Sequence, residues 1–197
     1  MTPTSTSTNN SANHATVVDL PCQDCNTARE LIPKDDACRD FRSTLGRFAT
    51  GVTVITTLAP DGEPIGVTIS SFNSVSLDPP LILWSLSLNS PNLEVFSNAS
   101  HYAVNILSAD QQEISDRFAS RSNKRFEGIN LHSGLGGVPL LEDCCASFEC
   151  TNEAHYPGGD HLIFVGHVER FTQGEAESPL IFHNGSYRLL NDISTTD

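Results

Sequence analysis

The sequence predicts a mainly β protein, an antiparallel barrel decorated by a few helices. β-Branched and apolar runs separated by short turns recur along the 197 residues, and such runs are typical of strands. Only two or three segments show the apolar spacing of a helix, and the strand–helix–strand alternation of a parallel sheet is absent. Many short strands with few helices favour a closed antiparallel architecture.

The chain length predicts one well-buried domain with a tail, because 197 residues are few for two domains. Residues 1–37 are rich in Thr, Ser and Asn and show no apolar periodicity. We therefore expect a leader that is disordered or drapes over the domain. The folded domain is expected over residues 38–192, followed by a short tail at 193–197.

A helix is predicted over Asp40–Ala49. Phe41, Leu45 and Phe48 are spaced as i, i+4 and i+7, which puts them on one apolar stripe. Gly51 is expected to end this element.

A β-hairpin is predicted next. The β-branched runs Gly51–Leu58 and Ile65–Ser70 are joined by a turn that contains Pro60, Asp61 and Gly62. A further extended piece ends at Asp78-Pro79-Pro80, and Leu81–Leu88 is predicted as the following strand.

Two short helices flank a strand expected over His101–Leu107. The first is predicted over Ser90–Phe96, because Ser90 followed by a proline is typical of a capped helix start. The second is predicted to run to Ala119, from a capping box and an apolar face formed by Ser108, Gln111, Ile114 and Phe118.

The last third of the chain predicts a glycine-rich loop and then strands. Gly134–Leu141 is expected to be loop. Strands are predicted at Cys145–Cys150, His161–Phe171 and Pro179–Phe182, and the turn Asn184-Gly185 precedes an extended Tyr187–Leu190.

The charge balance excludes two classes of partner. The formal net charge is −13, from 24 acidic and 11 basic side chains, so neither nucleic acid nor an anionic membrane would be attracted. No apolar run approaches the roughly 20 residues of a membrane span, and the N-terminus lacks the pattern of a secretory signal. These features predict a cytoplasmic protein.

The cysteines and histidines do not predict a metal site. Cys22, Cys25 and Cys38 lack a fourth ligand at short spacing. His155, His161 and His167 are spaced by six, but the turn between the first two breaks their alignment. Reduced, small buried thiols are the expected state of the six cysteines.

Three polar turns are candidate binding elements. Thr68–Ser74 and Ser85–Ser90 carry closely spaced hydroxyl groups, which can hold a phosphate or a flat polar ring without lysine. Gly158-Gly159-Asp160 allows a tight turn that places His161 at the start of a strand. There a neutral histidine can hydrogen bond a carboxamide or a ring carbonyl.

Each candidate also has a purely structural interpretation. Ser90 can cap a helix without any ligand, and His161 can be satisfied by a neighbouring loop carbonyl. Arg121, Lys124 and Arg125 can hold a phosphate or form a solvated face that balances the carboxylates before them.

Several blocks of the chain together resemble the short-chain flavin reductases, the NAD(P)H:flavin oxidoreductase components of two-component monooxygenases. In order, these blocks read TGVTVITT, GVTISSFNSVSLDPPLIL, NSPNLEVF, YAVNILSADQQEISDRFAS, RFEG, GDHLIFVGHVE and PLIFHNGSYR. They span roughly Asp40 to Leu190, and the leader lies outside the resemblance.

The resemblance implies a homodimeric split β-barrel that binds FMN or FAD. The flavin ring would lie on the turn Thr68–Ser74 and the phosphate end near Ser85–Ser90, whereas the nicotinamide would lie beside His161 and Tyr187. The cofactor-binding residues implied in this way are Thr68, Ser70, Ser71, Phe72, Ser85, Ser87, Asn89, Ser90, Ala119, Ser120 and Arg125.

The function implied is hydride transfer from a nicotinamide to a flavin that then serves a partner oxygenase. His161 would be a positioning residue, and no acid–base residue is required. The scarcity of basic residues near the nicotinamide side favours NADH over NADPH. Two alternatives stay open: a flavin-binding electron carrier, and a corrin reductase or pyridoxamine-phosphate oxidase-like enzyme on a similar barrel.

Overall fold

The computed structural model describes residues 36–120 and 124–191. The chain divides into two compact units, residues 1–42 and 43–197. The second unit carries the strands and the candidate site. The leader's CxxC pair, Cys22 and Cys25, and the basic residue Arg121 lie outside the described residues.

The first helix, α1, covers Asp36–Leu45, so its predicted bounds were wrong at both ends. It ends four residues earlier than expected because Gly46 follows Leu45, and glycine favours a helix end over a helix interior. Phe48 therefore lies in the turn after the helix, where its N–H donates to the Leu45 carbonyl at 3.1 Å. Its ring is 73% exposed.

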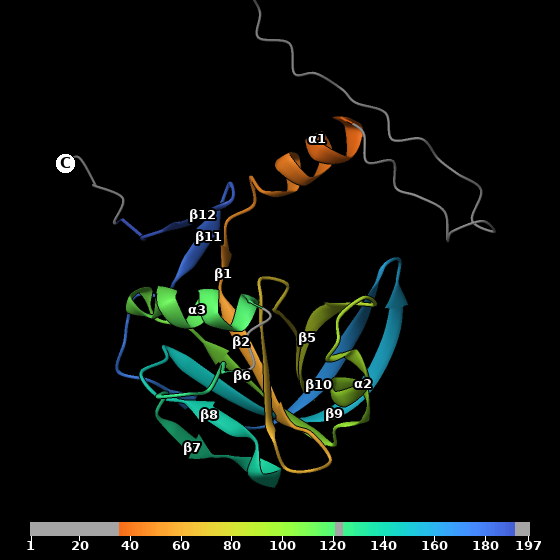
Figure 1. Cartoon of the computed structure of the whole chain (residues 1–197), viewed down its shortest axis with the longest axis vertical. Helices are drawn as coiled ribbons and strands as arrows, with labels where there is room; N and C mark the ends of the chain where they lie inside the picture. Colours follow the sequence, from red (N-terminus) through yellow and green to blue (C-terminus); the bar gives the residue numbers. More distant parts are fainter. Residues whose placement is uncertain (1–35, 121–123, 192–197) are drawn as a thin grey trace, which may run out of the picture. The chain divides into compact units, whose positions relative to one another are not determined.

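Most strands form one antiparallel sheet of seven strands in the order β3-β2-β6-β9-β10-β5-β4. Figure 1 shows the long β9 and β10 together as a hairpin beside β5. The strand bounds are β2 Thr53–Leu58, β3 Pro64–Ile69, β4 Asn73–Leu77, β5 Pro80–Ser87, β6 His101–Ile106, β9 Ala146–Gly158 and β10 His161–Gln173.

The prediction of a mainly β fold with few helices is confirmed. The strands β3 and β4 are the two ends of the sheet order, and the segment 70–72 connects them. Within the described residues no ladder between β3 and β4 closes the sheet into a continuous barrel. None of the helices in this part of the chain is long and apolar enough to cross a membrane.

The aromatic core lies on the inner side of β5, β6 and β10. The Trp84 ring stacks on Phe164 with centroids 4.3 Å apart and meets Phe96 and Tyr102 edge to face. All four side chains are fully buried. Gly166 makes this packing possible, because a Cβ there would lie 2.0 Å from the Tyr102 hydroxyl oxygen.

Asn105 joins three strands through a buried set of hydrogen bonds. Its side-chain amide donates to the Val54 carbonyl at 3.0 Å and to the Thr56 hydroxyl at 3.1 Å. Its carbonyl oxygen accepts the Leu141 N–H at 3.0 Å. Because the side chain is fully buried, each of these bonds replaces water that the asparagine lost on folding.

Two smaller sheets complete the fold. One has the order β1-β11-β12, and the other pairs β7 with β8. The second corrects the expectation that Gly134–Leu141 is loop, since Pro139–Leu141 is strand. The bounds are β1 Thr50–Gly51, β7 Leu131–Ser133, β8 Pro139–Leu141, β11 Ile181–His183 and β12 Ser186–Arg188.

The helices of the second unit are short. They are α2 Leu93–Asn98 and α3 Gln112–Ala119, with single 3₁₀ turns η1 Ala109–Gln111 and η2 Leu135–Gly137. The predicted capping box is confirmed, with the Ser108 N–H donating to Gln111 Oε1 at 3.0 Å. Phe118, on the apolar face of α3, is buried as expected.

Candidate functional site

The outer face of β5 presents two of the predicted serines. Burial alternates along this strand, with Trp84 and Leu86 buried and Ser85 and Ser87 half-buried. Because successive side chains of a strand point to opposite faces, Ser85 and Ser87 share the outer face. The aromatic core thus fixes the strand that carries the hydroxyl groups.

The register of β10 brings His161 to the same face. His161 pairs directly with Ser87, and Ile163 pairs with Ser85. Directly opposed side chains of antiparallel strands leave the sheet on one side, so the histidine and the predicted anion-binding turn are neighbours. The prediction that His161 begins a strand is confirmed.

Tyr156 and Ile163 extend this face and were missed in the sequence. Tyr156 pairs with Ile163 across β9 and β10, and its side chain is 56% exposed. The alternation of β10 could have indicated Ile163. Tyr156 was not predicted as a strand residue, because its neighbours Pro157 and Gly158 are typical of a loop. Strand β9 nevertheless continues to Gly158.

The hairpin turn holds His161 in a fixed position. Gly159 has φ +67°, a conformation that glycine adopts without strain, so the predicted tight turn is confirmed. The Asp160 carbonyl accepts the Leu88 N–H at 2.9 Å. This bond ties the turn to the segment that follows β5.

Asp160 also orients the His161 ring. His161 Nδ1 and Asp160 Oδ1 lie 2.7 Å apart, and the hydrogen bond from His161 lowers the pKa of this carboxyl group. An ionised carboxylate can only accept, so Nδ1 carries the proton. In the neutral ring, Nε2 is then a hydrogen-bond acceptor.

The segment from Thr68 to Phe72 is tied to two different elements. The Thr68 hydroxyl donates to the Ser115 carbonyl of α3 at 2.7 Å. The Ser71 hydroxyl donates to the Ser85 carbonyl at 3.2 Å and accepts the Ser85 N–H at 3.0 Å. Both hydroxyl protons are thus donated within the fold, and these bonds hold the backbone of this segment in place.

Phe72 and Ser70 differ in what they offer a ligand. The Phe72 ring packs against the aromatic core and stacks on Phe148 with centroids 5.8 Å apart. Ser70 is exposed, and its hydroxyl makes no hydrogen bond within the described residues.

The turn after β5 carries two hydroxyl groups whose protons are available to donate to a ligand. The Ser87 hydroxyl oxygen accepts the Asn89 N–H at 3.2 Å, and the Ser90 oxygen accepts the Asn92 N–H at 3.3 Å. Each serine therefore keeps its O–H proton for an anion. This donor set fits the phosphate group of a flavin nucleotide.

The helix after this turn begins later than predicted. Asn92, not Ser90, is the N-cap residue, and the first helical residue is Leu93. Pro91 favours a turn here, and the Leu93 N–H bonds the Ser90 carbonyl at 3.2 Å. The capping role considered for Ser90 is therefore wrong.

The predicted cation Arg125 lies against the C-terminal end of α3. The Arg125 guanidinium donates to the Ser120 carbonyl from Nε at 3.0 Å and from Nη2 at 2.6 Å. A guanidinium has five N–H donors, so others stay available for an anion. Ala119 and Ser120 are exposed at the end of the same helix.

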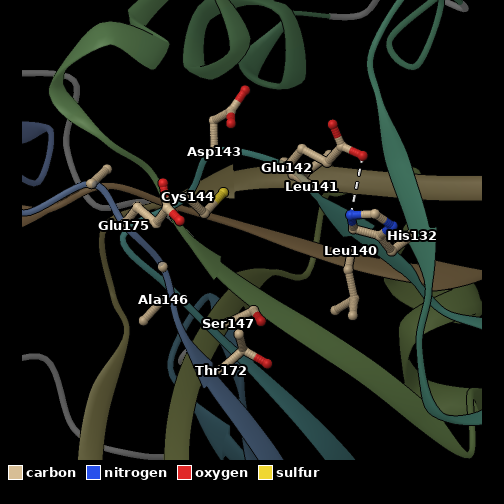
Figure 2. Close-up of a pocket in the computed structure, with 12 residues that line it drawn as sticks. His132, Leu140, Leu141, Glu142, Asp143, Cys144, Ala146, Ser147, Thr172 and Glu175 are labelled. Carbon is tan, nitrogen blue, oxygen red and sulfur yellow. Dashed lines mark ion pairs between the residues drawn. The ribbon is translucent and has the colours of Figure 1, made fainter.

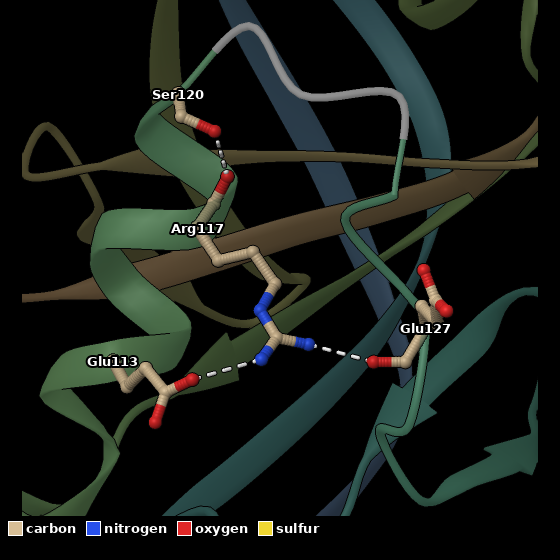
Figure 3. A network of polar contacts seen from close by, with 4 residues as sticks. All are labelled: Glu113, Arg117, Ser120 and Glu127. Atoms are coloured by element: carbon tan, nitrogen blue, oxygen red, sulfur yellow. Dashed lines mark hydrogen bonds and ion pairs between the residues drawn. The ribbon is translucent and has the colours of Figure 1, made fainter.

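Other charges near α3 balance one another. Figure 3 shows Arg117 between the Glu113 carboxylate, at 2.9 Å, and the Glu127 carbonyl, at 2.7 Å. Lys124 pairs with the Glu127 carboxylate at 3.0 Å. Lys124 thus pairs with a carboxylate that follows it and not with those before it, as the balanced-face interpretation had it, whereas Arg125 makes no ion pair within the described residues.

Tyr187 lies beside α3. Its hydroxyl lies 2.8 Å from the Ser115 hydroxyl and donates to Asp116 Oδ1 at 2.7 Å. Burial raises the pKa of Tyr187. Within one chain, Tyr187 therefore joins the Thr68 and Ser115 side of the site, whereas His161 belongs to the Ser87 side.

Two cavities of the protein lie elsewhere. One has a volume of about 510 Å³ and the other about 320 Å³, and none of the predicted cofactor residues lines either of them. The predicted residues lie instead on an open face. His155 turns away from that face: its ring meets Phe164 edge to face at 4.6 Å, and burial lowers its pKa.

The fold and this face define a mainly β oxidoreductase candidate with a hydroxyl-lined anion site beside a histidine. Residues 45–191 match the family model of the flavin reductase-like domain. The chain therefore belongs to the flavin reductase-like family.

Two relatives illustrate this membership. The FMN reductase (NADH) SmoA of Agrobacterium fabrum is 44% identical over 80% of this chain and 88% of its own length. The reductase component of the flavin-dependent trigonelline monooxygenase of Acinetobacter baylyi is 42% identical over 76% of this chain, which spans 48% of that relative.

A solved structure supports the same assignment. The Streptomyces globisporus NADH:FAD oxidoreductase SgcE6, in complex with NAD and FAD fragments, superimposes with a TM-score of 0.75. It is 34% identical and covers 85% of this chain and 99% of its own.

Proposed function

We propose that this protein is an NADH-dependent flavin reductase that reduces FMN or FAD and delivers the reduced flavin to a separate flavin-dependent oxygenase. The observation that carries the proposal is the pairing of His161 with Ser87. This pairing places a histidine on the same face as hydroxyl groups whose O–H protons are available to a ligand. Hydride transfer between the two bound rings supplies the chemistry.

The protein's own residues would bind and orient. The hydroxyl protons of Ser87 and Ser90 are free to donate to the flavin phosphate, because both oxygens already accept a backbone N–H. Arg125 would add a charge-assisted bond. The backbone from Ser70 to Phe72, held by Ser71, would support the ring.

His161 would position the nicotinamide. With Nδ1–H donated to Asp160, Nε2 of the neutral ring accepts an N–H, and a carboxamide provides one. This polarity favours the nicotinamide amide over a ring carbonyl as its partner. His161 needs to exchange no proton during hydride transfer.

NADH is favoured over NADPH by the formal net charge of −13, because an acidic chain attracts the additional 2′-phosphate of NADPH less. A 2′-phosphate usually requires an arginine. The relative SmoA is named for NADH as well.

A homodimer would complete the open site. Exposed apolar side chains occur on and beside the sheet β1-β11-β12, namely Phe48, Phe182, Leu189 and Leu190. Apolar groups gathered on a surface are typical of an interface. A second copy seated there would cover them and would give the split barrel its dimeric form. Light scattering after gel filtration would give twice the chain mass.

A cytoplasmic location agrees with the cysteines. Cys144, Cys145 and Cys150 are all free, as expected in a reducing compartment. Reduced nicotinamide is generated in the same compartment by ordinary metabolism.

The decisive experiment mixes the purified protein with NADH and free FMN, then with FAD, under anaerobic conditions. A reductase consumes NADH, read at 340 nm, in proportion to added flavin, and bleaches the flavin band. Tight yellow protein with no NADH consumption would instead identify an electron carrier. Turnover that requires a corrin or a pyridoxamine phosphate would identify a different enzyme on this fold.

A further inference from the structure

The cavity of about 510 Å³ named above lies away from the candidate flavin site. Its volume is within the usual range of small-molecule sites. Its walls come from β7, β8, the start of β9 and the segment after β10. None of the cofactor-binding residues described above lines it.

A close backbone approach shapes this cavity. The Gly174 N–H donates to the Cys145 carbonyl at 2.8 Å. A Cβ at Gly174 would lie 1.9 Å from the Cys144 carbonyl oxygen. Only glycine therefore lets the segment 174–176 lie against Cys144, and this packing brings Glu175 to the cavity.

The charged lining is acidic. Glu142, Asp143 and Glu175 line the cavity, and His132 pairs with Glu142 at 3.1 Å. Figure 2 shows the His132–Glu142 pair on one side and Glu175 beside Cys144 on the other. Among the described residues no lysine or arginine lines it, so Asp143 and Glu175 keep uncompensated negative charge.

Ser147 adds an unpartnered polar group. Its side chain is only 8% exposed, yet it lines the cavity and its hydroxyl makes no hydrogen bond in the described part of the chain. The hydroxyl oxygen is open to the cavity, so a ligand there would have it as a hydrogen-bond partner.

The remaining lining is apolar: Leu140, Leu141, Ala146 and Ala176. We propose that this cavity is a binding site for a small organic amine with a short apolar body. The ammonium group would donate to Glu175 and Ser147, Asp143 would add negative charge at the far end of the lining, and the body would lie on the leucine and alanine side chains. The proposal does not depend on the flavin reductase assignment.

The test is isothermal titration calorimetry of the full chain with benzylamine and, as its neutral counterpart, benzyl alcohol. At low salt we expect benzylamine to bind at least about tenfold more tightly than benzyl alcohol, because hydrogen bonds to charged groups are the stronger ones. Raising the ionic strength should weaken only the amine. Equal binding of the two compounds, or no heat with either, would overturn the proposal.

Three variants localise the site. Glu175→Gln should weaken benzylamine binding by about tenfold, and Asp143→Asn and Ser147→Ala should each weaken it by several-fold. Glu153→Gln makes the same change in net charge on an exposed β9 residue outside the cavity and should leave binding unchanged. An equal loss in Glu153→Gln, or no loss in Glu175→Gln, would show that general negative charge attracts the amine. The fluorescence of the single, buried Trp84 reports the fold of each variant without any enzymatic turnover and should not change.

Discussion

His161 on β10 lies directly opposite Ser87 on β5, so one sheet face carries both the histidine and the hydroxyl-rich turn. The two residues are 74 positions apart in the sequence, and only the strand register makes them neighbours. The ends of two packed strands position them, rather than a flexible loop. The predictions below follow from this face and from the core beneath it.

Replacing His161 with alanine should impair nicotinamide binding rather than chemistry. The KM for NADH is expected to rise about tenfold, because a hydrogen bond to the bound carboxamide is lost, with kcat within about twofold. Steady-state kinetics at saturating flavin would measure this. His167→Ala is the matched control on the same strand and should leave KM unchanged. Unaltered NADH kinetics in His161→Ala would remove the proposed role.

The carboxyl group of Asp160 should titrate below its ordinary range, because His161 hydrogen bonds its ionised form. A depressed pKa in the folded state contributes stability above the unfolded pKa, and this stability is lost as pH falls through the folded value. Carbon-detected NMR of the side-chain carboxyl would follow the titration. The midpoint should return toward the ordinary value in His161→Ala, and an unchanged midpoint would contradict the bond.

Ser87→Ala and Ser90→Ala should weaken flavin binding. Each removes one hydroxyl donor to the phosphate, and the Kd for FMN should rise about tenfold per site, since hydrogen bonds to charged groups are worth about 1.5–3 kcal/mol. Quenching of flavin fluorescence measures the Kd. Riboflavin, which lacks the phosphate, should bind the variants and the parent equally. Ser133→Ala, on the separate strand β7, is the control.

Asn105→Ala should lower the free energy of unfolding by about 2–3 kcal/mol, because it leaves the buried Leu141 N–H without its acceptor and removes one donor from the Val54 carbonyl. Urea denaturation followed by tryptophan fluorescence is suitable, since the single Trp84 lies in the core. The exposed Asn130→Ala should change stability by less than about 0.5 kcal/mol. A loss as small as that in Asn105→Ala would refute its structural role.

Cys144 and Cys150 should be unreactive in the folded protein. Burial raises the pKa of each thiol to about 12, which leaves little of the reactive thiolate at pH 8. Iodoacetamide labelling resolved by peptide mass spectrometry should modify both residues only after denaturation. Rapid labelling of either one in the native state would indicate local opening of β9 or of the segment before it.

The element types were largely predictable from the sequence, whereas their ends were not. The hairpin of β2 and β3 follows from β-branched runs around Pro60-Asp61-Gly62, and the structure confirms it. The β7–β8 hairpin was missed because its strands have only three residues each and glycines lie between them. Strand β9 was predicted too short because Pro157 and Gly158 look like loop residues, yet both pair with β10.

The candidate site was predictable as a set of residues, but not as an arrangement. Hydroxyl-rich turns and a histidine at a strand start are local patterns. The pairing of His161 with Ser87 and the commitment of Thr68 to α3 depend on long-range register, which periodicity does not specify. Tyr187 shows the same limit, because its contacts with Ser115 and Asp116 join segments about 70 residues apart.

The segment from Thr68 to Ser71 is fastened at one end to α3 and at the other to β5. A molecule that rests on it would restrain both elements together, although they are far apart in the chain. Amide hydrogen exchange would then slow in α3 and in β5 at the same ligand concentration. Such linked protection would report occupancy of this surface without any enzymatic turnover.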